Sequence, residues 1–189
     1  MKIAVASDIH GSLTAARAFF DQAAALGAEK ILLLGDLYYH GVRNPLPEGY
    51  DPRGVAELLN KNAERIIAVR GNCDSDVDLT VSVFSMPAEA FLFFGGKLIH
   101  ASHGDKYDID HLPKGKADVV LYGHYHTGFI KEKAGVVVAN PGSLSLPKEG
   151  TAKSFILLDE GTIRLYDLSG ALIQERDLCS TCICIWTDR

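Results

Sequence analysis

The sequence predicts an α/β protein in which two mixed sheets are flanked by helices, a four-layer α/β/β/α sandwich. Two features of the chain support this class. The first half alternates short apolar runs with segments of helical periodicity, which is typical of βαβ units and a parallel sheet. The second half contains closely spaced predicted strands separated by turns such as Gly95-Gly96 and Glu160-Gly161, which are typical of antiparallel hairpins.

The composition is that of a soluble globular domain. The chain has 189 residues, of which 47% are hydrophobic and 23% charged, so it is long enough for one well-buried domain and short for two. The net charge of −5 disfavours a nucleic-acid partner. No run approaches the ~18 apolar residues of a membrane span, and no signal-peptide pattern precedes the first predicted strand. We therefore expect a cytoplasmic protein without a membrane anchor.

Residues 1–178 are predicted to form a single domain, and residues 179–189 a tail outside it. The tail contains Cys179, Cys182 and Cys184, whose spacing invites interpretation as a metal site. However, no second ligand pair stands at zinc-finger spacing, and chain ends tolerate change. We expect the tail to be poorly ordered and to carry no function.

The elements of the first half follow one another in a regular order. An apolar strand over 2–7 precedes a helix over 14–26, with Ser12 as the expected N-cap and Gly27 as its stop. A strand over 31–34 completes the βαβ unit. A helix from about residue 52 to 63, a strand over 65–69 and a short helix over 75–82 continue the series.

A long loop over 37–50 interrupts this series. Loops of this length are usually functional or disordered, and its position directly after Asp36 favours a lid or a substrate wall. Beyond Pro87 the pattern changes to closely spaced strands, and the pairing is expected to be mostly antiparallel. These strands are predicted at 90–94, 97–102, 119–122, 129–132, 136–139, 154–159, 162–166 and 171–176.

Side chains able to bind a metal follow five of the predicted strands. In an open α/β sheet, sites form in the crevice beyond the carboxyl ends of the strands, so we expect these side chains at one place. A buried carboxylate also requires a compensating cation or hydrogen bonds. The candidate ligands are Asp8, His10, Asp36, Asn72, His103, His124 and His126.

The residue types of this set indicate its chemistry. Carboxylate and amide oxygens together with neutral imidazoles favour Mn²⁺, Fe²⁺, Co²⁺, Ni²⁺ or Zn²⁺ over Ca²⁺. The set exceeds what one ion normally takes from a protein, and two divalent ions sharing the Asp36 carboxylate account for it. Such sites clamp the attacking and leaving oxygens of an in-line displacement at phosphorus and lower the pKa of a bound water. The set therefore predicts phosphoester hydrolysis by a hydroxide between two ions.

Five motifs occur in order along the chain: Asp8-x-His10, Gly35-Asp36, Gly71-Asn72-x-Asp74, His103-Gly104 and Gly123-His124-x-His126. Together they resemble the motifs of the calcineurin-like metallophosphoesterases. The resemblance is closer to the small bacterial phosphodiesterases of the YfcE type, through residues 7–12, 40–44, 46–50, 67–75 and 140–143, and it covers roughly residues 1–175. The resemblance implies the metallophosphoesterase fold, Mn²⁺ as the usual metal and hydrolysis of phosphodiesters or phosphomonoesters. It also implies a division of the ligands: Asp8, His10 and His126 on one metal, Asn72, His103 and His124 on the other, with Asp36 bridging.

One position departs from the family pattern. Many members carry a His after the Asn, placed to protonate the leaving alkoxide, whereas this chain has Cys73. A thiol with a pKa near ~8.5 is not an obvious replacement, so we expect faster hydrolysis of esters with acidic leaving groups. His40 is a second candidate for the missing acid or for a phosphate ligand.

Further residues are candidates for contact with the substrate. Asn72, His103 and His124 are expected to act in catalysis as well as in metal binding, with His103 or His124 helping to place the phosphate. Arg43, Asn44 and Arg70 are candidates for gripping phosphate oxygens, because the guanidinium group suits that geometry, although Arg70 could instead form a structural ion pair. Asp74 is expected either to orient a neighbour of the site or to stabilise its turn.

The sequence thus predicts a metal-dependent phosphodiesterase that acts on a small-molecule phosphoester. A phosphomonoesterase or a cyclic-nucleotide hydrolase would use the same site, because substrate choice lies in loops 37–50 and 105–116. A non-catalytic scaffold with a degraded metal site is disfavoured by the complete ligand set, and P-loop chemistry by the absence of its motif. Apolar edge strands suggest a homo-oligomer, either a dimer or a tetramer.

Overall fold

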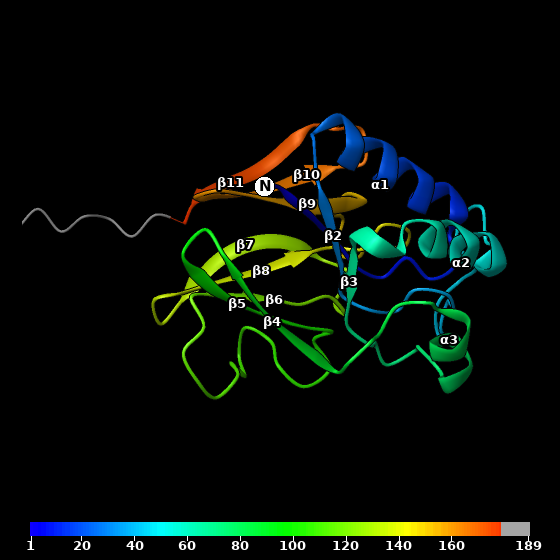
Figure 1. Cartoon of the computed structure of the whole chain (residues 1–189), viewed down its shortest axis with the longest axis horizontal. Helices are drawn as coiled ribbons and strands as arrows, with labels where there is room; N and C mark the ends of the chain where they lie inside the picture. The colour runs from blue at the N-terminus through cyan, green and yellow to red at the C-terminus, as the bar shows by residue number, and fades with distance from the viewer. Residues whose placement is uncertain (179–189) are drawn as a thin grey trace, which may run out of the picture.

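The computed structural model describes residues 1–178, which form two β-sheets packed face to face (Figure 1). Its strands are β1 (Ile3–Ala6), β2 (Lys30–Leu33), β3 (Ile66–Ala68), β4 (Glu89–Phe94), β5 (Lys97–Ser102), β6 (Val119–Leu121), β7 (Gly128–Lys133), β8 (Val136–Pro141), β9 (Ser154–Asp159), β10 (Thr162–Asp167) and β11 (Leu172–Asp177). The first sheet has the order β11-β10-β9-β1-β2-β3 and the second the order β4-β5-β6-β8-β7. The predicted class of two mixed sheets is confirmed. The predicted tail, residues 179–189, lies outside the described residues.

Helices α1 (Leu13–Ala25) and α2 (Pro52–Lys61) cover the outer face of the first sheet (Figure 1). The side chain of Ser12 caps α1 by accepting a hydrogen bond from the backbone N–H of Ala15, as its sequence position predicts. Asp51 caps α2 in the same way through the N–H of Gly54. β1, β2 and β3 are parallel, so both crossovers of the first half place their helices on one side.

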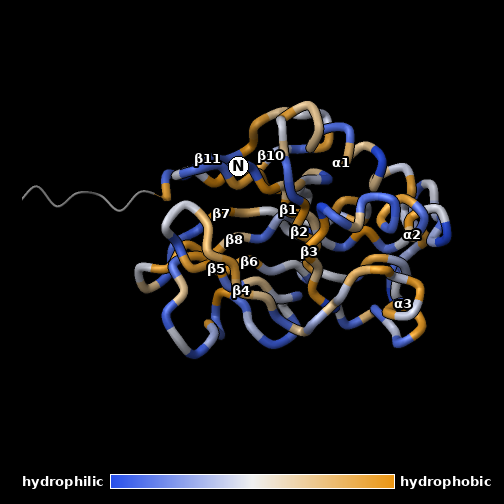
Figure 2. The backbone as a smooth tube through the Cα atoms, viewed as in Figure 1, coloured by the Kyte–Doolittle hydropathy of each residue, from blue (hydrophilic) through white to orange (hydrophobic). Residues whose placement is uncertain are grey.

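The central strands of the first sheet, β9, β1 and β2, are buried on both faces. Ala4 and Ala6 of β1 pack toward the helices, whereas Ile3 and Val5 pack toward the second sheet. Hydrophobic residues accordingly follow one another along the central strands in Figure 2. A strand that is buried on both faces appears in the sequence as a continuous apolar run, and such runs were the basis for predicting these strands. No helix in the described part of the chain is both long enough and apolar enough to cross a membrane.

The outer face of the second sheet carries an irregular segment, residues 103–118, which includes the loop predicted over 105–116. The four-layer prediction had placed helices on this face, and the described residues have none there. Ile109 and Leu112 of this segment pack against Val120 and Tyr122 of the sheet region. The segment contains two glycines, a proline and many charged residues, which disfavour a helix. The short helix α3 (Asp76–Val81) instead packs through Leu79 against the core on the helical side of the first sheet.

The pairing of the second sheet brings two loops to one edge. β6 pairs parallel with both β5 and β8, whereas β4 and β7 pair antiparallel with their neighbours. Because β5 and β6 run in the same direction, the loops that follow them leave the sheet at the same end. These loops carry the predicted ligands of the second half, starting at His103 and at His124.

Strand β11 lies over β7, the edge strand of the other sheet. The side-chain amide of Gln174 accepts a hydrogen bond from the backbone N–H of Ile130 at 2.9 Å and donates one to its carbonyl at 2.6 Å. Arg176 forms an ion pair with Glu132 beside it. The Gln174 amide therefore takes the place of a neighbouring strand and joins the edges of the two sheets.

Candidate metal centre

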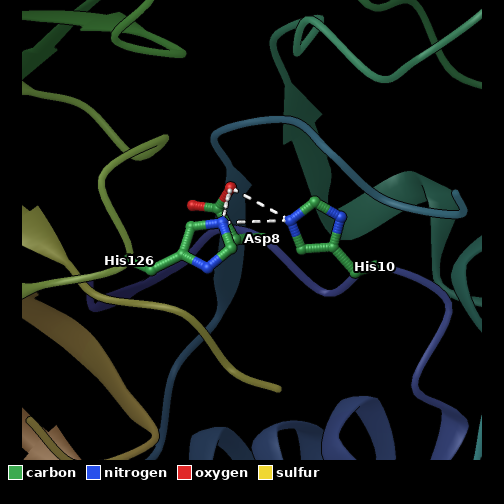
Figure 3. A group of neighbouring side chains, drawn as sticks. All are labelled: Asp8, His10 and His126. Carbon is green, nitrogen blue, oxygen red and sulfur yellow. Dashed lines mark hydrogen bonds and ion pairs between the residues drawn. The ribbon is translucent and has the colours of Figure 1, made fainter. Parts of the chain in front are cut away.

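Three of the predicted ligands form a first cluster at the carboxyl ends of the strands (Figure 3). Asp8 and His10 follow β1, and His126 lies in the loop after β6. The Oδ1 atom of Asp8 lies 3.2 Å from Nε2 of His126 and 3.6 Å from Nε2 of His10, and the two Nε2 atoms are 3.1 Å apart. All three side chains are buried. Their donor atoms therefore surround one point.

The atoms that face this point are all acceptors. Nδ1 of His10 donates to the carbonyl of Tyr39 at 2.7 Å, and Nδ1 of His126 donates to the carbonyl of Leu146 at 2.6 Å. Because a neutral imidazole has a single N–H, both Nε2 atoms then present lone pairs. Oδ1 of Asp8 is buried and receives no hydrogen bond within residues 1–178. Buried acceptors that face one another without a donor fit a bound cation.

A second cluster surrounds Asp36, which follows β2. Nε2 of His103 lies 3.5 Å from Oδ2 of Asp36 and 2.9 Å from Oδ1 of Asn72. Nδ1 of His124 lies 3.2 Å from the same His103 nitrogen. Nδ1 of His103 donates to the carbonyl of Leu34 at 2.7 Å, so in the neutral ring Nε2 presents the lone pair. This cluster again offers oxygen and nitrogen ligands to a divalent ion.

The carboxylate of Asp36 stands between the two clusters. Its Oδ2 atom is 3.8 Å from Nε2 of His10 in the first cluster and 3.5 Å from Nε2 of His103 in the second. A carboxylate in this position can contact two ions at once. The seven predicted ligands are therefore brought together at one place, and their division between two ions stays a prediction.

Asp74 holds the backbone around this carboxylate. Its oxygens accept hydrogen bonds from the N–H groups of Asp36 at 2.8 Å, Leu37 at 2.8 Å and Gly71 at 2.7 Å. A Cβ atom at Gly71 would lie 2.2 Å from Oδ1 of Asp36, so the close approach of the two loops requires glycine. The orienting role predicted for Asp74 corresponds to these contacts.

Five of the seven predicted ligands have a left-handed backbone. The φ angles are 55° at Asp8, 50° at His10, 55° at Asp36, 67° at His124 and 61° at His126. This conformation is disfavoured by roughly 1–2 kcal/mol for residues with a Cβ atom, and it persists only where the surroundings enforce it. It turns the chain sharply at the strand ends, which directs successive side chains into the crevice.

The ionisable ligands shift one another's pKa values. Burial raises the pKa of Asp8, but the contacts with His10 and His126 outweigh it and hold that pKa below its usual range. Burial lowers the pKa of His103, but the adjacent Asp36 outweighs it and raises that pKa to about 9. His103 therefore retains a proton at neutral pH when no cation is bound, and a divalent ion would take the place of that proton.

The remaining predicted site residues other than His40 are divided between two hollows. A cleft of 720 Å³ lies over the clusters, and Arg43, Asn44 and Cys73 line it. Arg70 lines a smaller hollow of 220 Å³ on another side of Asn72, where its guanidinium donates to the Asp74 carbonyl and the Asp76 carboxylate. Of the two roles expected for Arg70, phosphate binding or a structural ion pair, these contacts correspond to the ion pair.

His40 does not line the cleft. Its ring lies edge-on to Tyr39 and Tyr50, with centroid distances of 4.7 Å and 5.3 Å. Its backbone carbonyl accepts a hydrogen bond from the Asn44 amide at 2.8 Å. The contacts of His40 are therefore those of a residue that shapes the loop over 37–50.

Six residues that line the cleft are absent from the sequence-based set: Tyr39, Gly41, Val42, Tyr125, Lys148 and Glu149. Tyr125 lies between two predicted ligands, so its position in the sequence could have indicated it. Lys148 is brought to the site by a hydrogen bond from its N–H to the carbonyl of His126 at 3.1 Å. A contact between such distant segments leaves no local signal in the sequence.

Comparison with known proteins agrees with this geometry. The family model of the calcineurin-like phosphoesterase superfamily domain matches residues 1–162. The chain belongs to the calcineurin-like phosphoesterase superfamily. Within this superfamily it is 40% identical to the phosphodiesterase YfcE of Escherichia coli strain K12 over 171 residues, which are 89% of this chain and 93% of YfcE. Membership implies divalent metals, and the two clusters fit them.

Two solved structures extend the comparison. The phosphoesterase YfcE from E. coli matches with a TM-score of 0.91 and 36% sequence identity, covering 95% of this chain and all of that one. Vps29 from Chaetomium thermophilum matches with a TM-score of 0.66 and 19% identity, covering 93% of this chain and 97% of Vps29. The second likeness shows the fold alone. The predicted superfamily and fold are confirmed.

Proposed function

We propose that this chain is a metal-dependent phosphodiesterase that hydrolyses a small-molecule phosphodiester with two divalent ions, of which Mn²⁺ is the first choice. The observation that carries the proposal is the group of buried imidazoles and carboxylates on both sides of Asp36, in which Oδ1 of Asp8 has no donor within residues 1–178. The relation to the phosphodiesterase YfcE supports the same reaction class. The cytoplasm is the proposed location.

Two ions bound here would neutralise charge on the phosphoryl oxygens and lower the pKa of a water between them. In the proposed arrangement Asp8, His10 and His126 hold one ion, Asn72, His103 and His124 hold the other, and Asp36 contacts both. The carbonyls that accept from the imidazole Nδ1 atoms keep the Nε2 lone pairs directed inward. The protein thus contributes side chains with fixed orientations. These would fix the positions of the ions and, through them, hold the phosphate in line for attack.

Cys73 lies in the cleft as a poor proton donor. Its backbone N–H donates to Oδ1 of Asp36 at 2.8 Å. Burial raises the pKa of its thiol to about 12, and the nearby Asp36 carboxylate contributes to the same shift. A thiol of this pKa stays protonated at neutral pH and gives up its proton reluctantly. The proposed enzyme therefore relies on the leaving group's own acidity.

The test is hydrolysis of bis-p-nitrophenyl phosphate and p-nitrophenyl phosphate by chelator-stripped protein, with and without added metal. We expect no cleavage without metal, recovery with Mn²⁺ ahead of Zn²⁺, Fe²⁺, Co²⁺ and Ni²⁺, and preference for the diester. Asp36→Asn, checked for folding by circular dichroism, should not recover. Cleavage of the monoester alone would make the protein a phosphomonoesterase. An inert protein that takes up no metal would make it a scaffold.

A further inference from the structure

We propose that the cleft selects phosphodiesters in which one alcohol carries both a planar ring and a second anionic group, as in a nucleotide with an additional phosphate. This inference rests on the phosphodiesterase function proposed above and names its substrate class. At 720 Å³ the cleft has the volume of a site for a drug-sized ligand, much more than one phosphate group fills. Its two walls carry different chemistry.

The first wall is the turn over residues 40–44. The side-chain amide of Asn44 donates to the His40 carbonyl at 2.8 Å, and the N–H of Asn44 donates to the Gly41 carbonyl at 3.1 Å. Gly41 is buried, and a Cβ atom there would lie 3.4 Å from Sγ of Cys73. The turn is therefore anchored next to the metal centre and presents Arg43 on its exposed side.

Arg43 is exposed, lines the cleft and forms no ion pair or side-chain hydrogen bond within the part of the chain that the structure describes. A guanidinium group offers a planar set of donors that matches phosphate or carboxylate oxygens. The two clusters supply the positive charge for the reacting phosphate once ions are bound. The guanidinium of Arg43 therefore serves a second anionic group of the same substrate.

The second wall presents the ring of Tyr125. Tyr125 is 47% exposed as a residue. Its ring lies edge-on to His124 at a centroid distance of 5.4 Å, and its hydroxyl donates to Oδ2 of Asp108 at 2.9 Å. These contacts hold the ring in place without covering it. A fixed, half-exposed aromatic ring is suited to packing against a planar group such as a nucleobase.

Charge differs between the walls. Lys148 and Glu149 lie on the same side as Tyr125, because the N–H of Lys148 donates to the carbonyl of His126. Their opposite charges largely cancel, so this wall has little preference for an anion. Arg43 leaves the first wall with an uncompensated positive charge. The substrate should therefore bind with its ring at Tyr125 and its second anion at Arg43.

The test uses full-length Mn²⁺-loaded protein and two diesters with the same leaving group: thymidine 5′-(p-nitrophenyl phosphate) and the same compound with a 3′-phosphate. We expect kcat/KM to be about tenfold higher for the 3′-phosphorylated probe, mainly through KM, as for one charge-assisted contact. Arg43→Gln should bring this ratio close to one. The matched control is Arg53→Gln on α2, where an exposed arginine pairs with Glu57, and it should keep the ratio.

The ring is tested with methyl p-nitrophenyl phosphate as a diester whose alcohol has no ring. Tyr125→Leu should lower kcat/KM for thymidine 5′-(p-nitrophenyl phosphate) relative to the methyl ester by about tenfold, as expected for one lost stacking contact, whereas Tyr125→Phe should keep the preference. Equal kcat/KM for the two thymidine probes, or a ratio that Arg43→Gln leaves unchanged, overturns the inference and leaves the phosphodiesterase function intact. Failure to cleave any diester, bis-p-nitrophenyl phosphate included, overturns that function instead.

Discussion

At the scale of single residues, the centre depends on the hydrogen bonds made by the imidazole nitrogens that face away from the metal position. The imidazoles of His10, His103 and His126 all donate from Nδ1 to a backbone carbonyl. Each carbonyl selects the tautomer and the ring direction at once. The residue types alone thus do not make the site, since the tautomer of each ring depends on main-chain atoms elsewhere in the chain.

Cys73 leads to a prediction about the leaving group. Because its thiol is a poor proton donor, diesters that release an aryl alcohol should be cleaved much faster than those that release an alkyl alcohol. We expect kcat for methyl p-nitrophenyl phosphate to exceed that for dimethyl phosphate by at least about 100-fold at neutral pH, the lower range for a missing general acid. Steady-state kinetics of the Mn²⁺-loaded protein measure the ratio, with free Mn²⁺ as the background control. Equal kcat values would show that another group protonates the leaving oxygen.

The sequence predicted that the seven candidate ligands lie together, because they follow the ends of apolar runs whose strand directions bring them to one edge. It did not predict the left-handed backbone at five of them, because that conformation is enforced by contacts between loops. Arg43 and Asn44 were expected near the substrate and do line the cleft. Lys148 also lines it, but its place there could not be predicted from the sequence. Its approach depends on a hydrogen bond to the distant His126.

At the scale of elements, the contact between β11 and β7 should contribute measurably to stability. Gln174→Leu removes both hydrogen bonds to Ile130 and leaves a backbone N–H and a carbonyl without partners. We expect the free energy of unfolding to fall by about 1–3 kcal/mol, measured by urea denaturation. Ile173→Thr, at a half-exposed neighbour on the same strand, is the control and should change it by less than about 0.5 kcal/mol. Equal effects of the two substitutions would mean that the edges of the sheets are not joined through this amide.

Most elements could be predicted closely from local patterns. The helix expected over 14–26 is α1 at Leu13–Ala25, and the strand expected over 97–102 is β5 at the same residues. The loop over 105–116 was predicted, but its packing as the outer layer of the second sheet was not, because that packing depends on apolar contacts with β6 and its neighbours. The order of strands in that sheet also depends on pairing between distant segments, such as β6 with β8.

At the scale of the whole molecule, metal binding should be coupled to folding. With free Mn²⁺ at 100 times its dissociation constant, stabilisation is about 2.7 kcal/mol, which corresponds to a rise in Tm of roughly 5–10 °C for a domain of this size. Calorimetry of chelator-stripped protein with and without Mn²⁺ measures it. Because the pKa of His103 is raised to about 9, protons compete with the ion, so the rise should grow as the pH increases toward 9. Asp8→Asn should show a smaller rise, and an equal one would indicate that the ion binds elsewhere.

The predicted dimer or tetramer stays a prediction. Phe91 and Phe93 lie on β4, an edge strand of the second sheet, with exposed fractions of 64% and 79%. Exposed apolar edges of this kind are commonly covered by another chain. An assembly of copies of this chain would be expected to use this strand.

The left-handed backbone at five ligands has a consequence for which ions the protein accepts. A ligand on a relaxed loop can move outward to suit a larger ion, whereas these side chains are held by turns that the surrounding structure already constrains. Ca²⁺ is larger and takes six to eight oxygen ligands, so it would require the crevice to widen and the imidazoles to withdraw. We therefore expect the site to discriminate against Ca²⁺ through its rigidity as well as through its ligand types.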